Sequence, residues 1–202
     1  MPAITLSVTL ITRNERANIA ECLRSVAFAD EWIVVDSGST DGTREIAESM
    51  GATVVTTDDW PGFGPQKNRA LDHAQGRWVL SLDADEELSP GLQREIAACK
   101  AREVRSETGG FSMPRCVLYE GRWIRHGDWY PDRVVRLWRK DRGRWEGIEP
   151  HASVQDAREA IARYGLTVRD TLDVVEAAVG GMPVSTVIDG RARYSVSLRY
   201  AA

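Results

Sequence analysis

The first half of the chain alternates between two kinds of segment, and this alternation limits the possible fold more than any other feature. The apolar runs are continuous, as expected for strands that are buried on both faces of a parallel sheet. Amphipathic stretches lie between them, so the spacing predicts an α/β fold, a mostly parallel doubly wound sheet with helices on both faces. The expected strands are Leu6–Ile11, Trp32–Val35, Thr53–Val55 and Trp78–Leu82, and the expected helices are Ala17–Phe28, Thr43–Met50, Gln66–His73 and Pro90–Lys100.

Polar residues follow three of the expected strands. Thr12, Asn14 and Glu15 follow the first, Asp36 ends the second, and Asp83 comes directly after the last. In open α/β sheets, ligands bind beyond the carboxyl ends of the strands. Three separate strands therefore direct functional groups toward one edge of the sheet, where we expect the ligand site.

The run Asp83-Ala84-Asp85-Glu86-Glu87, called the acidic cluster below, holds four carboxylates. Carboxylates this close repel one another, and the repulsion grows as they are desolvated. A divalent cation that bridges to a diphosphate removes that cost, and oxygen ligands suit Mg²⁺ or Mn²⁺. The alternative is a solvated helix start with Ser89 as N-cap and Pro90 in the first turn. We assign function to Asp83 and Asp85, and the helix start to Glu86 and Glu87.

Two further motifs have both a functional and a structural interpretation. Asp36 can accept hydrogen bonds from a nucleobase or a ribose, although an Asp in a Gly/Ser turn is also ordinary turn chemistry. The segment 60–70 places two glycines before a helix that carries Lys67. Free amide groups and an ammonium make this a candidate anion site, whereas an exposed Lys67 is the simpler alternative.

The pattern changes in the second half of the chain. Gly109–Tyr119 and Arg133–Arg139 have the character of antiparallel strands, separated by the aromatic-rich loop Glu120–Asp132. Beyond Ser153 the aromatic density falls, and the sequence predicts two helices followed by a two-stranded hairpin. The helices are Gln155–Tyr164 and Val168–Val179, and the strands are Val184–Ile188 and Arg193–Tyr200.

Charge and cysteine content limit the classes of protein to which this chain can belong. The formal net charge is −4, which gives no support to nucleic-acid binding. The cysteines number 3 and are widely spaced, which favours reduced thiols and a cytoplasmic location over a disulfide framework. The N-terminal apolar run fits a strand better than a signal peptide, and no apolar stretch is long enough to span a bilayer.

The motifs together resemble family 2 inverting glycosyltransferases with the GT-A fold, most of all the bacterial lipopolysaccharide-core glucosyltransferase group. The resemblance covers residues 4 to about 151. It implies metal-dependent transfer of a sugar from a nucleotide diphosphate sugar, with UDP expected, to a glycan or lipid-linked acceptor. It also implies that the protein acts at the inner face of the inner membrane, with which it would associate peripherally. The matching segments are 11–15, 35–43, 62–68, 80–86 and 122–133.

The resemblance also implies roles for single residues. Asp36 would hold the base, Asp83 would face the ribose, and Asp85, the last residue of the Asp-x-Asp motif, would bind Mg²⁺ or Mn²⁺. The remaining nucleotide contacts would come from Thr12, Asn14, Glu15, Lys67 and Asn68. His126, Trp129 and Arg133 would shape the acceptor side, while core packing is an equal explanation for Trp123 and Trp129.

The catalytic base is the open point of the resemblance. Inverting transfer needs a base to deprotonate the acceptor hydroxyl. Members of the group often carry an acid directly after a histidine, but here Ala152 follows His151. The candidates that remain are Glu149, Glu146 and Asp128, with Glu149 preferred. A damaged base position would leave a protein that binds nucleotide sugars and transfers them poorly.

The segment from about Ser153 is similar to part of a periplasmic docking subdomain of heavy-metal efflux pumps of the resistance–nodulation–division class. We therefore expect two parts, a nucleotide-sugar-binding domain over 1–151 and a small α+β appendage over 152–202. This interpretation makes the chain a fusion or chimera. A third functional hypothesis follows, in which the appendage is a docking module and the protein serves interaction rather than chemistry.

Overall fold

The computed structural model describes residues 5–101, 109–127, 130, 132–147, 153–154, 175–177, 183–189 and 192–197. For the strands beyond residue 147, the description here concerns the backbone. None of the described helices combines the length and the apolar character needed to cross a bilayer.

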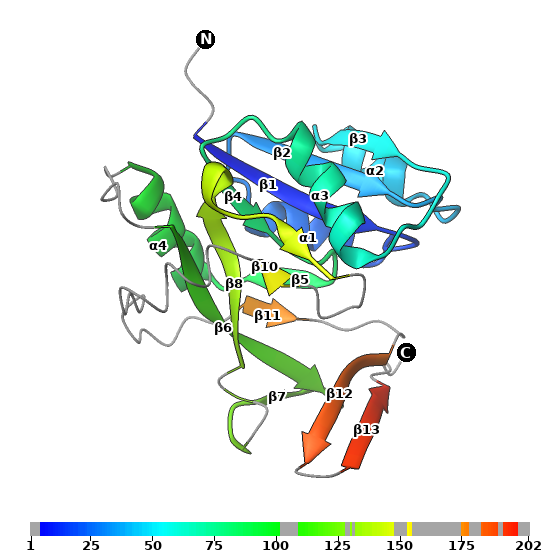
Figure 1. The fold of residues 1–202 in the computed structure, drawn as a ribbon, viewed down its shortest axis with the longest axis vertical. Coiled ribbons are helices and arrows are strands. Elements are labelled where there is room, and N and C mark those ends of the chain that lie inside the picture. The colour runs from blue at the N-terminus through cyan, green and yellow to red at the C-terminus, as the bar shows by residue number, and fades with distance from the viewer. Residues whose placement is uncertain are drawn as a thin grey trace.

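A large mixed sheet runs through the middle of the molecule (Figure 1). Its first part has the strand order β3-β2-β1-β4, and all neighbours in this part are parallel. The carboxyl ends of these strands therefore meet at one edge. The bounds are Leu6–Thr12 for β1, Glu31–Asp36 for β2, Thr53–Thr56 for β3 and Trp78–Ser81 for β4.

The second part of the sheet continues from β4 in the order β8-β6-β11-β5, with β7 paired to β6. β8 is antiparallel to both β4 and β6, whereas β11 is parallel to β6 and antiparallel to β5. The bounds are Glu86–Leu88 for β5, Gly110–Tyr119 for β6, Arg122–Ile124 for β7, Asp132–Arg139 for β8 and Val175–Ala177 for β11.

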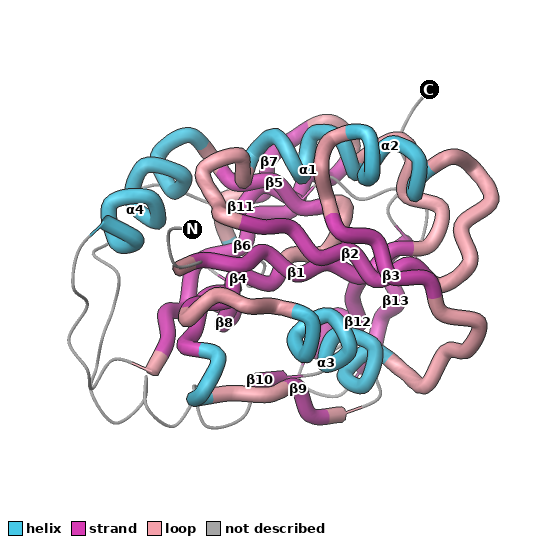
Figure 2. Tube along the Cα trace, turned by 90° about the horizontal axis from the view of Figure 1, so that it is seen from above, coloured by secondary structure: helices cyan, strands magenta, loops and turns pink. Residues whose placement is uncertain are grey.

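Helices cover both faces of the parallel part (Figure 2). α1 (Ile19–Ser25) and α2 (Thr43–Ser49) lie on one face, and α3 (Phe63–His73) lies on the other, beside the short strand β9 (Trp145–Glu146). The remaining elements are α4 (Pro90–Ala101), the 3-10 turn Lys140–Arg142, β10 (Ser153–Val154), which pairs with β9, and the hairpin of β12 (Pro183–Asp189) and β13 (Ala192–Ser197).

The main core lies between the sheet and the α1–α2 layer. Val8, Leu23, Val34 and Leu80 have no exposed surface there. Burial of each such side chain contributes about 1.5–3 kcal/mol, which anchors the strands whose ends form the ligand edge. A smaller cluster on the α3 face joins α3 to β4, β8 and β9 through Leu71, Ala74, Val79, Trp138 and Trp145.

The predicted strands and helices of the first half are confirmed, with shifts of a few residues at their ends. β3 is not buried on both faces, because it is the edge strand and its ends are exposed. The loop Glu120–Asp132 contains a short strand, β7, that the sequence interpretation missed.

Two predictions about local structure were wrong. Glu86–Leu88 is a strand and not a helix start, because β11 supplies a pairing partner that local sequence does not reveal. Val175–Ala177, predicted as helix, is that partner strand. Ser89 does cap α4, since its Oγ accepts a hydrogen bond from the amide of Leu92 at 3.3 Å. The predicted helix Gln155–Tyr164 lies outside the described residues.

Candidate functional site

The parallel strands bring the polar strand ends together as predicted. Thr12 of β1 lies beside Asp36 of β2 in the strand register. Asp83 follows β4, which flanks β1 on its other side. The carboxyl edge therefore brings together polar side chains from three adjacent strands, of which Thr12 and Asp36 are buried.

Asp36 is fully buried, and its carboxylate organises the loop that follows β2. Oδ1 accepts hydrogen bonds from the amides of Gly38 at 3.1 Å and Ser39 at 2.8 Å. Oδ2 accepts one from Thr12 Oγ1 at 3.0 Å and another from the hydroxyl of Ser39. Arg44 Nε adds an ion pair at 3.8 Å. The turn interpretation of Asp36 therefore holds, and its contact with a base stays a prediction.

Asn14 joins the loop after β1 to the loop after β2. It adopts a left-handed backbone conformation with φ of 59°. Its amide donates to Ser39 Oγ at 2.8 Å, and its Oδ1 accepts from the amide of Thr40 at 2.9 Å. The next amide, of Glu15, donates to Thr43 Oγ1 at 2.8 Å. These bonds hold both loops in one arrangement without a ligand.

Asp83 is bound by two cations from different elements. Lys67 Nζ of α3 lies 2.7 Å from Oδ1, and Arg136 Nη2 of β8 lies 2.9 Å from Oδ2. Burial alone would raise the pKa of Asp83, but the charges of Lys67 and Arg136 outweigh it and hold that pKa well below its usual range. Asp83 therefore stays ionised, and both of its oxygens already have partners.

Arg136 and Glu86 form a buried ion pair behind Asp83 that the sequence interpretation missed. Their side chains are 4% and 2% exposed, and Arg136 Nη2 contacts Glu86 Oε1 directly. Glu86 Oε2 also accepts the amide of Asp83 at 3.1 Å. The assignment of Glu86 to a solvated helix start is thus wrong. A usable signal was the arginine between apolar residues in β8, because a buried charge needs an opposite charge nearby.

Asp85 has a different environment from Asp83. Its side chain is half-buried, and among the described residues no cation forms an ion pair with it. Burial raises the pKa of Asp85 to about 8, and the charges of Asp83, Glu86 and Glu15 add to the effect. Burial also raises the pKa of Glu15. Without a bound cation, the site therefore favours the protonated, neutral form of Asp85.

This charge balance fits a divalent cation at Asp85. Carboxylate oxygens are the ligands that Mg²⁺ and Mn²⁺ prefer, and a cation would remove the repulsion that raises the pKa of Asp85. Within the described residues, no three His, Cys, Asp or Glu side chains are grouped to hold a metal ion by themselves. A cation here would need further oxygen ligands from a bound molecule or from water.

The pKa of Asp85 predicts a pH dependence of stability in the ligand-free protein. The folded protein keeps this proton up to about pH 8, whereas the unfolded chain loses it near pH 4. The folded state binds more protons in between, so its free energy of unfolding falls as the pH rises from about 4 to about 8. We expect Asp85→Asn to be about 1–3 kcal/mol more stable than the unaltered chain at pH 8, and equal to it at pH 4.

Urea unfolding of both proteins at pH 4.5, 6.5 and 8 would measure this difference. Asp72→Asn is the control, because Asp72 lies on the outer face of α3 in an exposed ion pair with Arg144. A stability difference between Asp85→Asn and the unaltered chain that stays constant with pH would contradict the raised pKa.

Lys67 and Asn68 lie on the side of α3 that faces β9. The Lys67 ammonium lies 4.5 Å from the ring centre of Trp145, in a cation–π contact. Asn68 uses both ends of its amide on the backbone of Trp145, donating to the carbonyl at 2.9 Å and accepting from the amide at 3.0 Å. Lys67 is buried rather than exposed, and it points at Asp83 rather than at the start of the helix.

The close approach of α3 to β9 requires a glycine at position 64. A Cβ at Gly64 would lie 2.1 Å from the carbonyl oxygen of Gly147, directly after β9. We expect Gly64→Ala to push β9 away from α3 and to lower the free energy of unfolding by about 1–3 kcal/mol. Urea unfolding measures the loss. Gly121→Ala adds a Cβ in open space at a φ of 72°, so it strains a turn far from β9 and should leave the Trp145 environment unchanged.

A near-UV circular dichroism spectrum would report on the packing of Trp145 against Trp138, whose rings lie 5.6 Å apart. Unchanged stability together with an unchanged spectrum in Gly64→Ala would refute the close approach of α3 and β9.

The acceptor-side residues are only partly described. His126 and Arg133 are both exposed, on the segment after β7 and on β8. Glu146 is exposed at the end of β9. Their roles stay predictions. The other candidates for the base and the acceptor side, Glu149, Asp128 and Trp129, lie outside the described residues.

The chain matches the model of the family described as Glycosyl transferase family 2 over residues 7–156. It is 31% identical over 169 residues to the lipopolysaccharide core biosynthesis glycosyltransferase LpsC of Rhizobium meliloti, covering 78% of this chain and 62% of that protein. It is 40% identical over 117 residues to the uncharacterized glycosyltransferase RT0209 of Rickettsia typhi, covering 57% of this chain and 40% of that protein. The chain thus spans about two fifths to three fifths of the length of these relatives.

Among solved structures, the fold resembles S. aureus TarS 1-349 in complex with UDP-GlcNAc, with a TM-score of 0.55 and 22% identity. The match covers 88% of this chain and 60% of that chain. At this identity the likeness concerns the fold, and it agrees with the predicted GT-A type of sheet. The family match extends past residue 151, and β11 pairs within the main sheet, so the division at 151 stays a prediction. The family match covers the parallel strands, the acidic cluster and the cations around it. The chain therefore belongs to glycosyl transferase family 2.

Proposed function

We propose that this chain carries the donor-binding part of a metal-dependent inverting glycosyltransferase. It takes a sugar from a nucleotide diphosphate sugar, with UDP as the nucleotide, and transfers it to a glycan or lipopolysaccharide-core acceptor. Family membership and the likeness to LpsC support the reaction class and the acceptor class. The chain covers only part of these relatives, so the complete reaction is part of the proposal.

The observation that carries the proposal is the separation of charge at the acidic cluster. Lys67 and Arg136 neutralise Asp83, while Asp85 next to it has a pKa of about 8 and no cation of its own among the described side chains. This leaves one carboxylate open to a cation and one held rigidly beside it. Such a pair suits a diphosphate that arrives together with a divalent metal.

Each group of residues at the carboxyl edge of the sheet has a proposed role in binding the donor. Asp85 holds Mg²⁺ or Mn²⁺, which when bound neutralises the departing diphosphate. Asp83, fixed by its two cations, faces the ribose. The loops that contain Thr12, Asn14 and Asp36 form the base end, where their mutual hydrogen bonds orient peptide groups before the donor arrives. Glu15, Lys67 and Asn68 border the same region.

The acceptor side completes the proposal. Deprotonation of the acceptor hydroxyl requires a base on the face opposite the leaving diphosphate. We assign that base to Glu149 first and to Asp128 second, and the acceptor contacts to His126, Trp129 and Arg133. Glu149→Gln should remove transfer while leaving the binding of UDP intact, because the base acts on the acceptor and not on the nucleotide.

Calorimetric titration of UDP with and without Mn²⁺ tests the proposed function. We expect binding that depends on the metal, followed by transfer or slow hydrolysis when a UDP-sugar replaces UDP. Metal-dependent binding of several UDP-sugars without any turnover would leave a nucleotide-sugar-binding protein instead of an enzyme. No effect of any nucleotide on a folded chain would overturn the donor site itself.

A further inference from the structure

Trp60 is an exposed tryptophan at the carboxyl edge of the sheet. It is 45% exposed, and among the described residues it is the only large apolar side chain with such exposure. It lies in the loop between β3 and α3, at the carboxyl end of the parallel strands. A single exposed apolar side chain is ordinary on a protein surface. Trp60 is a candidate for binding because it lies at the edge of the sheet where the proposed donor site is.

The loop that carries Trp60 is fastened to the Asp36 strand end. The amide of Thr57 donates to the carbonyl of Asp36 at 2.9 Å. The buried side chain of Gln66 donates to Thr57 Oγ1 at 2.7 Å and to Ser37 Oγ at 2.9 Å. Three hydrogen bonds therefore place this loop beside the base end of the proposed donor site.

The Trp60 ring packs against one aromatic neighbour, and the residue before it is fixed by an ion pair. Phe63, at the start of α3, meets Trp60 edge-to-face with ring centres 4.9 Å apart and planes at 90°. The neighbouring Asp59 forms a two-pronged ion pair with Arg69, both N–O distances being 2.7 Å. Because this contact is edge-to-face, Phe63 leaves at least one face of the Trp60 indole uncovered.

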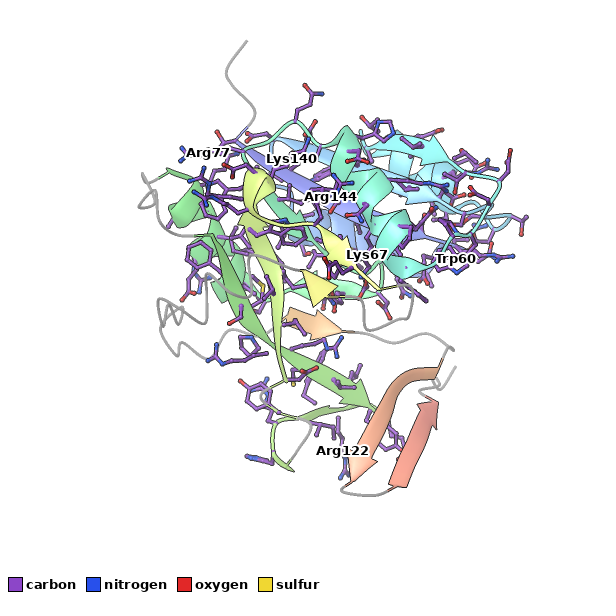
Figure 3. All side chains as sticks on the ribbon, viewed as in Figure 1. Trp60, Lys67, Arg77, Arg122, Lys140 and Arg144 are labelled. Atoms are coloured by element: carbon purple, nitrogen blue, oxygen red, sulfur yellow. The ribbon has the colours of Figure 1, made fainter. Side chains whose placement is uncertain are left out.

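Charge indicates which part of a nucleotide sugar the ring meets. Arg69 neutralises Asp59, but the exposed Asp58 next to it disfavours a diphosphate close to Trp60. The cation Lys67 lies one turn after Phe63 in α3, and its ammonium points at Asp83. In Figure 3, Lys67 lies nearer the middle of the molecule and Trp60 lies toward its right-hand side. The diphosphate therefore belongs on the Lys67 side, and the uncharged base belongs on the Trp60 side.

We propose that Trp60 is the stacking surface for the nucleobase of the donor. This inference rests on the proposed function, since it assumes that a nucleotide binds at this edge. Stacking of a base on an aromatic side chain depends on the π-face of the base and not on its hydrogen-bonding edge. Trp60 thus contributes affinity for the nucleotide, while the polar groups near Asp36 select among bases.

The test compares a nucleotide with a ligand that lacks the base. UDP and inorganic pyrophosphate are titrated, each with Mn²⁺, into the unaltered chain, Trp60→Ala and Trp60→Phe. We expect Trp60→Ala to weaken UDP binding about tenfold and to leave pyrophosphate binding unchanged. Trp60→Phe should retain most of the UDP affinity, because it keeps an aromatic face. Thermal unfolding of all three proteins checks that they fold equally well.

Several outcomes would overturn the inference. Equal UDP affinity for Trp60→Ala and the unaltered chain would do so while leaving the proposed function standing. Equal weakening of UDP and pyrophosphate would place the effect on the site as a whole and not on the base. A raised KM for the acceptor with unchanged UDP affinity would assign the ring to the acceptor. Failure of UDP to bind the unaltered chain would reject the proposed function and this inference together.

Discussion

Asp85→Asn should lower the affinity for UDP in the presence of Mn²⁺ by about a hundredfold or more, and leave the weaker metal-free binding unchanged. The substitution keeps the size of the side chain but removes the charge that the cation would balance. Half-buried Asp85 has no cationic partner among the described side chains, so nothing else compensates for it. Calorimetric titration of UDP with Mn²⁺ measures the metal-dependent affinity, and titration with a chelator measures the metal-free affinity.

Two controls separate a metal ligand from general damage to the site. Asp72→Asn, on the outer face of α3, should bind UDP like the unaltered chain, because its ion pair with Arg144 is exposed at both ends. Asp83→Asn should lower stability as well as affinity, since it releases Lys67 and Arg136 from their shared partner. Metal-dependent binding that survives Asp85→Asn would show that another group holds the cation.

Arg136→Met should lower the free energy of unfolding by about 3–5 kcal/mol, the range for removing one partner of a buried ion pair. Arg136 is 4% exposed, and its loss would leave Glu86, which is 2% exposed, without its charge partner. Urea unfolding at pH 7 measures the effect.

Matched variants test this explanation. Arg144→Met breaks an exposed ion pair with Asp72 and should cost at most about 1 kcal/mol. The double variant Arg136→Met with Glu86→Gln should recover part of the stability, because the buried charge is then gone from both partners. If Arg136→Met and Arg144→Met cost the same, Arg136 does not neutralise a buried carboxylate.

The parts of the fold that could be predicted depend on local patterns. β1, β2 and β4 are marked by continuous apolar runs, and the polar residues after them identify the ligand edge. The parallel register then brings Thr12 and Asp36 together without further information. The location of the candidate site could therefore be read from the sequence alone.

The partners of the acidic cluster could not be predicted, because they come from distant parts of the chain. Arg136 and Glu86 are 50 positions apart, and only the antiparallel pairing of β8 with β4 brings them together. The same limit applies to β5 and β11, whose pairing contradicts a helix start at Glu86 and a helix at Val175–Ala177. The resemblance of about residues 153–202 to an efflux-pump segment, and with it the fusion, stays a prediction.

The hydrogen bonds between the loops after β1 and β2 have a consequence for binding kinetics. Asn14, Ser39 and Thr43 hold the proposed base end in one conformation, and Asp36 already accepts several hydrogen bonds. Chain entropy at this end is lost when the protein folds, so a nucleotide does not have to order these loops when it binds. Association at the base end should then be a single step, limited by encounter, and any slower step after it should come from the acceptor side.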